Sequence, residues 1–180
     1  MAEINTQNVQ IYLVDDDELQ LKIIRNKFLT STDYQLRTFT SGEEFLETII
    51  RKPLNKWLHH IVILDFQLHS TSNHDAKNGL EILQILKGIN PAIQVIMLSG
   101  VSDEDIQQKA TRFGAVEFIR KNENSFTRIN NAIKWIISSN DLKRKQRASK
   151  MALGLFLSVL GSAAILVVTL YLLYPDWFKV

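Results

Sequence analysis

The sequence has 180 residues, of which 46% are hydrophobic and 22% charged, with three prolines and no cysteine. This excludes a collagen-like, low-complexity or globally disordered chain and leaves room for one domain of ordinary size. Without cysteine there is no disulfide framework and no thiolate zinc site, which fits a reducing compartment. The net charge of +2 is uneven, because residues 1–140 sum to −2 and residues 141–150 to +4. The main domain therefore gives no indication of a nucleic-acid-binding surface.

Strand-like and helix-like patterns alternate over residues 10–137. Short apolar runs rich in β-branched residues predict strands at 10–14, 34–39, 60–64, 93–98 and 116–119. Apolar residues spaced by three and four predict helices at 18–29, 41–50, 79–86, 106–113 and 126–137. Continuous apolar strands separated by amphipathic helices are typical of a parallel sheet that is covered on both faces. We therefore predict an α/β fold with a doubly wound, five-stranded parallel sheet.

Polar residues directly follow four of the predicted strands. In an open parallel sheet, ligands bind outside the carboxyl ends of the strands, where the strand order reverses. Carboxylates packed together repel one another unless a cation enters, and hard oxygen ligands suit Mg²⁺. Any one of these residues is better explained as a solvated strand end or a helix cap, but the set indicates a site. Its members are Asp15, Asp16, Asp17, Asp65, Ser99, Gly100 and Lys121.

The segments that carry these residues are YLVDDD, VILDF, IMLSG and GAVEFIRK, in that order along the chain. Together they resemble the receiver domain of two-component response regulators, over about residues 9–139. The resemblance implies the flavodoxin-like strand order 2-1-3-4-5. It also implies a domain that takes a phosphoryl group from a histidine kinase or a phosphotransfer protein in a Mg²⁺-dependent reaction. Such a domain is no enzyme beyond its own phosphorylation from a phosphodonor and slow dephosphorylation.

The same resemblance assigns the acidic residues. Asp65 would be the phospho-acceptor and also a metal ligand. Asp16 would bind Mg²⁺ directly and Asp15 largely through water, with the backbone carbonyl of Gln67 as a further protein contact. Asp17 is better explained as a carboxylate that starts the next helix.

Three more residues receive roles in phosphate contact and switching. Lys121 would pair with a phosphate oxygen, and Ser99 would turn inward to hydrogen-bond the phosphoryl group. Phe118 stands at the family's aromatic switch position, although an ordinary core position explains it as well. Phosphorylation would then change the surface built from the fourth helix, the fifth strand and the fifth helix.

The sequence departs from the family's pattern at two places near this site. Asn122 follows Lys121 where the family commonly has a proline, so we expect a trans peptide bond or a rearranged loop there. The segment 66–78 is about six residues longer than usual, polar, and lacks its usual proline. Its His69 and His74 could bind a metal, but two histidines in a loop are usually just solvated.

Residues 151–174, MALGLFLSVLGSAAILVVTLYLLY, form an uncharged run. As a helix they reach about 36 Å, enough to cross a hydrocarbon core of about 30 Å. A helix buried in a soluble core is the alternative, but the flanking residues favour a transmembrane helix with the basic side in the cytoplasm. Tyr171, Tyr174 and Trp177 mark the far end. The basic side carries Lys143, Arg144, Lys145, Arg147 and Lys150.

This basic run lacks interleaved aromatic residues, so contact with anionic lipid headgroups explains it better than nucleic acid does. Gly154, Ser158 and Ser162 recur every four residues and leave a homodimer open. The expected organisation is an N-terminal tail (1–8), a receiver (9–139), a basic juxtamembrane linker (140–150), a transmembrane helix (151–174) and a short external tail (175–180).

The leading hypothesis is a phosphorylatable receiver that is tail-anchored in a membrane, by family resemblance the bacterial inner membrane. Because the anchor follows where a DNA-binding domain usually stands, its expected output is contact with an unknown protein. A phosphate-independent binding module is the first alternative. The second, a phosphatase resembling the haloacid dehalogenases through Asp15-x-Asp17, would leave Asp65 without a role and would need more acids near Lys121 than Glu123.

Overall fold

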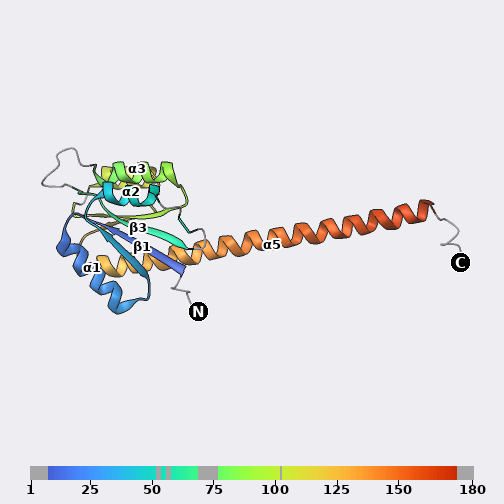
Figure 1. The fold of residues 1–180 in the computed structure, drawn as a ribbon, viewed down its shortest axis with the longest axis horizontal. Coiled ribbons are helices and arrows are strands. Elements are labelled where there is room, and N and C mark those ends of the chain that lie inside the picture. The colour runs from blue at the N-terminus through green and yellow to red at the C-terminus, as the bar shows by residue number, and fades with distance from the viewer. Residues whose placement is uncertain (1–7, 52–53, 56–57, 69–76, 102, 174–180) are drawn as a thin grey trace. The chain divides into compact units, whose positions relative to one another are not determined.

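The computed structural model describes residues 8–51, 54–55, 58–68, 77–101 and 103–173 (Figure 1). By its internal contacts the chain divides into two compact units, Met1–Ile137 and Ser138–Val180.

The first unit contains a five-stranded parallel sheet with the strand order β2-β1-β3-β4-β5. This confirms the predicted fold class and the predicted order. Each predicted strand is present, with ends that differ by at most one residue. The strands are β1 (Val9–Val14), β2 (Gln35–Phe39), β3 (His59–Asp65), β4 (Gln94–Ser99) and β5 (Glu117–Arg120).

Helices cover both faces of this sheet, as expected (Figure 1). One face packs against α1 and the first turns of α5, through residues such as Phe28 and Ile133. The other face packs against α2, α3 and α4, through residues such as Phe45 and Leu83. The helices are α1 (Glu18–Ser31), α2 (Gly42–Arg51), α3 (Gly79–Ile89), α4 (Glu104–Arg112) and α5 (Ser125–Leu173).

Side-chain alternation along the central strands explains why both layers are needed. In β1, Ile11 and Leu13 point to the α1 side, whereas Tyr12 and Val14 point to the α2 side. All four are buried. Since successive residues of a strand face opposite sides, a strand that is apolar at every position requires a cover on both faces.

The second unit is helical from residue 138 to Leu173, as the continuation of α5. The linker predicted at 140–150 is therefore part of a helix, which is consistent with the lack of glycine and proline between residues 125 and 153. Every side chain described between residues 151 and 169 is exposed. Among the residues that the structure describes, no helix is long and apolar enough to cross a membrane. The predicted transmembrane span is therefore not confirmed by the structure.

Candidate functional site

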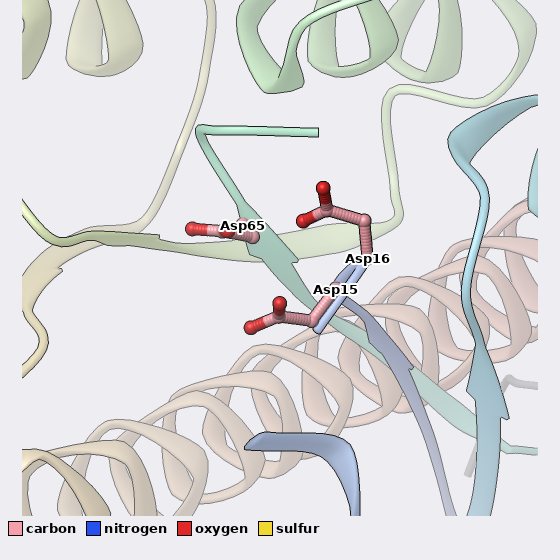
Figure 2. Close-up of side chains that lie close together, drawn as sticks. All are labelled: Asp15, Asp16 and Asp65. Carbon is pink, nitrogen blue, oxygen red and sulfur yellow. The ribbon is translucent and has the colours of Figure 1, made fainter. Parts of the chain in front are cut away.

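Three carboxylates meet at the carboxyl edge of the sheet (Figure 2). Asp15 and Asp16 follow the last residue of β1, and Asp65 ends β3. Each offers one oxygen that lies within 4.8 Å of the others. Asp15 is fully buried and Asp65 is 3% exposed, whereas Asp16 is partly exposed. The pairing of Val14 with Leu64 explains this meeting, because it aligns the ends of two neighbouring strands.

Lys121, just beyond the end of β5, joins two of these acids. Its Nζ lies 2.8 Å from Asp15 Oδ2 and 2.8 Å from Asp65 Oδ2. Its backbone N–H donates to the carbonyl of Ser99, which fixes the turn after β5 against the end of β4. The peptide bond before Asn122 is trans, as expected without the proline. The lysine thus reaches the acidic pair with asparagine at the next position.

Burial shapes the titration of this cluster. Desolvation, together with the negative charge of Asp15, raises the pKa of Asp65 to about 6, against the opposing effect of the Lys121 ammonium. For Lys121, burial alone would lower the pKa, but its hydrogen bonds to Asp15 and Asp65 outweigh burial and raise it. Lys121 is therefore a permanent cation at neutral pH, and Asp65 is a carboxylate that gains a proton in mild acid.

One oxygen of Asp65 lacks a partner. Asp65 Oδ1 is buried and makes no hydrogen bond within the part of the chain that the structure describes. An unpaired buried carboxylate oxygen costs free energy, on the order of 1–3 kcal/mol or more. Such an atom is suited to receive a cation or to act as a nucleophile.

Gly79 allows the first turn of α3 to pack closely against the backbone of Asp65 and Phe66. The residue was not among those predicted for the site. A Cβ at this position would lie 2.2 Å from the carbonyl oxygen of Asp65. The Gly79 N–H donates to the carbonyl of Phe66 over 2.9 Å, and Asn78 caps α3 through a capping box. Glycine at the first position of a helix directly after a long loop is the sequence signal that could have suggested it.

The two predicted switch residues lie in the expected elements: Ser99 is the last residue of β4, and Phe118 lies within β5. Ser99 is fully buried, and its hydroxyl donates to Val101 O over 3.0 Å and accepts from Val101 N–H over 3.1 Å. The hydroxyl is therefore engaged with the loop after β4. Phe118 is partly buried and packs against the core on the α2 side of the sheet.

The remaining candidates have simpler positions. Asp17 caps α1 by accepting from the N–H groups of Leu19 and Gln20, which confirms the helix-start interpretation. Gln67 has an exposed side chain, and its backbone amide lowers the pKa of Asp65 slightly. His69 and His74 lie outside the described residues. The predicted membrane-flanking residues belong to the second unit and are exposed: Lys143, Arg144, Lys145, Arg147 and Lys150.

The donor set fits a hard divalent cation. Three carboxylates converge, all the candidate ligand atoms are oxygens, and one buried oxygen of Asp65 has no partner within the described ranges. Mg²⁺ prefers a few carboxylate ligands and keeps room for water and phosphate oxygens. Asp15, Asp16 and Asp65 are the residues that would hold it.

The family model for the response regulator receiver domain matches residues 11–134, more than half of the chain. The chain belongs to this family. Receiver domains serve two-component signalling, generally use Mg²⁺ in an acidic pocket, and interact with histidine kinases or phosphotransfer proteins.

Curated relatives agree with this assignment. The transcriptional regulatory protein MalR of Bacillus subtilis is 29% identical over 142 residues, which cover 77% of this chain and 52% of MalR. The transcriptional regulatory protein TdiR of Thauera aromatica is 28% identical over 121 residues, which cover 67% of this chain and 48% of TdiR. The chain thus spans about half the length of the curated relatives that it matches.

Solved receiver domains have the same fold. A receiver domain from Clostridium thermocellum aligns with a TM-score of 0.61 at 26% identity, covering 74% of this chain and 98% of that one. The BeF3-activated receiver domain of DrrB aligns with a TM-score of 0.54 at 28% identity, covering 69% and 97%. A CheY-like protein from Methanospirillum hungatei has a TM-score of 0.61 at 21% identity, covering 74% and 97%, and supports the fold alone.

Proposed function

We propose that this receiver accepts a phosphoryl group on Asp65 in a Mg²⁺-dependent reaction and signals through protein contacts. The observation that carries the proposal is the meeting of Asp15, Asp16 and Asp65 at one edge of the sheet, where Asp65 Oδ1 is buried and has no hydrogen-bond partner among the residues that the structure describes. Lys121 supplies the cation beside it. The phosphodonor would be a histidine kinase or a phosphotransfer protein, and the domain would act on no external substrate.

Asp65 Oδ1 is the better nucleophile, because Oδ2 is held by Lys121. As this oxygen attacks phosphorus, the bond from phosphorus to the donor nitrogen breaks, and the leaving imidazole keeps the electron pair and takes up a proton. The product is an acyl phosphate on Asp65. Bound Mg²⁺ would neutralise charge on the phosphoryl oxygens. Lys121 contributes a second cation, and its contact with Asp15 keeps it in place when it turns from Asp65 to the new phosphoryl group.

Ser99 and Phe118 would report the reaction to the surface. The Ser99 hydroxyl exchanges its bonds to Val101 for one to the phosphoryl group, and the loop after β4 loses that restraint. The ring of Phe118, only partly buried, is free to follow. Such a two-position element is how a local charge becomes a change of surface.

The test uses residues 1–140, which keep the buried Ile136 and Ile137, with Mg²⁺ and a small phosphodonor. Mass spectrometry should find one added phosphoryl group that requires Mg²⁺ and is absent in Asp65→Ala. Asp33→Ala, which removes an exposed carboxylate between α1 and β2, should retain it. Failure to take up phosphoryl or beryllofluoride, with Mg²⁺ binding intact, would contradict the proposal and favour a phosphate-independent binding module.

We infer further that residues 151–174 hold the chain in a lipid bilayer as a single pass, with the receiver on the cytoplasmic side of a bacterial inner membrane. Support comes from the uncharged sequence and from the apolar side chains described between residues 151 and 168, which are exposed on all sides of the helix. The consecutive residues Leu155, Phe156 and Leu157 are 58–67% exposed. A helix that is apolar on every side requires an apolar environment around it.

Flotation of the full chain with phosphatidylcholine vesicles tests this attachment. The full chain should float with the vesicles and resist extraction by salt, whereas a chain ending at residue 150 should stay in the soluble fraction. A full chain that remains soluble as a defined oligomer would contradict membrane attachment and indicate that the apolar helices bury one another.

A further inference from the structure

A line of three basic residues runs along one face of the helix in the second unit. Lys143, Arg147 and Lys150 are spaced by four and three, which puts them on the same side of an α-helix. All three side chains are exposed. We call these three residues the basic stripe.

The charge of this segment is concentrated. Residues 141–150 carry five basic side chains and a single acidic one, Asp141. Lys143 and Lys150 are separated along the helix axis by about 10 Å. Neighbouring members of the stripe are only about 4.5–6 Å apart along the axis, within the Debye length of about 8 Å in physiological salt, so the three cations act jointly on a nearby anionic surface.

The basic stripe ends where the uncharged run begins, since Met151 follows Lys150 directly in the same helix. If the apolar part lies in hydrocarbon, the three cations come within two turns of the bilayer surface. Lipid phosphates lie at this level of the membrane surface. The flexible stem of a lysine or arginine side chain lets its charged group reach them.

We infer that the basic stripe binds the headgroups of anionic phospholipids and so favours membranes, or membrane regions, rich in them. This inference rests on the proposed membrane attachment. Each basic residue near such a surface strengthens association roughly five-fold, so three contribute roughly 100-fold. Nucleic acid fits less well, because no aromatic side chain stands among residues 141–150 to stack on bases.

A second copy of the helix is also a poorer occupant of this face. The stripe lies on the same side of the helix as Gly154 and Ser158, two of the small residues through which two parallel helices could approach. Parallel packing there would bring the like charges of both stripes face to face. Anionic lipid meets this face with charge of the opposite sign.

The test offers the full chain to a mixture of two vesicle populations and measures its distribution between them by density separation. One population is phosphatidylcholine, and the other also contains phosphatidylglycerol. The stripe variant carries Lys143→Gln, Arg147→Gln and Lys150→Gln, which keep good helix formers on an exposed face. The control variant carries Arg25→Gln, Lys109→Gln and Arg112→Gln, with the same change of charge at exposed positions of the receiver.

Wild type and control should prefer the anionic vesicles. In the stripe variant the ratio of anionic-bound to neutral-bound protein should fall roughly 100-fold, while binding to neutral vesicles remains. High salt should weaken the preference of wild type. Equal distribution of wild type, or equal loss in both variants, would overturn the inference and leave membrane attachment standing. Absence of binding to either population would overturn membrane attachment and this inference with it. Binding of duplex DNA that the stripe variant loses, without a vesicle preference, would assign the stripe to nucleic acid instead.

Discussion

Replacing Asp65 by asparagine should stabilise the receiver without Mg²⁺, and by an amount that depends on pH. The side chain is 3% exposed, and its pKa is raised to about 6 by burial. Asparagine has nearly the same shape and carries no charge. Lys121 keeps Asp15 as a partner when the carboxylate of residue 65 is removed.

The size of the effect follows from proton linkage. The unfolded carboxyl has its ordinary pKa of 3.8 and the folded one about 6. Between these values the native state binds the proton more tightly, so the stability of wild type falls as pH rises through this window. The cost is fully present above the folded pKa and absent below the unfolded one. It grows from about 0.5 kcal/mol at pH 4 to about 3 kcal/mol at pH 7, at 1.36 kcal/mol per pKa unit.

The assay is urea unfolding of residues 1–140 in chelator, for wild type, Asp65→Asn and the exposed control Asp33→Asn. The difference in unfolding free energy between Asp65→Asn and wild type should increase across pH 4–7, whereas the control should show no such increase. Added Mg²⁺ should reduce the difference at pH 7, because a cation bound by the native acids stabilises only wild type fully. A difference that is constant across this pH range would refute the assigned titration of Asp65.

Three further predictions concern the same edge of the sheet. Phosphorylation of Asp65, relative to hydrolysis of the donor alone, should speed up as pH rises through mild acid, because the carboxylate attacks, and more Mg²⁺ should move that rise to lower pH by favouring the charged form; a rate that falls as pH rises would contradict this. Lys121→Met should raise the pKa of Asp65 above its wild-type value in a carbon-13 NMR titration, since the ammonium now lowers it; an unchanged value would count against the pairing. Gly79→Ala should destabilise by about 1–3 kcal/mol in urea unfolding, because its Cβ would collide with backbone. Gly88→Ala, with open space around its Cβ, should stabilise by about 0.5–1 kcal/mol, and similar losses for both would refute the steric argument.

The sequence carried enough information for the sheet and for most of its carboxyl edge. Apolar periodicity located each strand, and the change from apolar to polar marked the strand ends. Because parallel strands end at one edge, Asp15 and Asp65 could be placed together although fifty residues separate them. Boundaries were less certain: Tyr34 was predicted in a strand that begins at Gln35, since a buried aromatic residue packs equally well just outside it.

Other features depended on contacts that a sequence does not display. The ion pairs of Lys121 with both acids require the turn after β5 to lie against β4, which is fixed by a backbone hydrogen bond. The requirement for Gly79 arises from the backbone of residue 65, not from its own neighbours in sequence. The change in charge pattern at 140–150 does not end the helix, because those residues contain no glycine or proline and α5 continues through them.

The energetics of Asp65 indicate that this residue serves the chemistry of the site and not the stability of the fold. β3 is apolar and buried at every position from Ile61 to Leu64, so an apolar side chain at residue 65 would extend the core. The chain instead places a carboxylate there, with a raised pKa and one oxygen that no described residue pairs with. The Lys121 ammonium compensates only part of that cost. A cation or a phosphoryl group at Asp65 would relieve the rest, so the same free energy that weakens the empty fold would favour the bound or phosphorylated state.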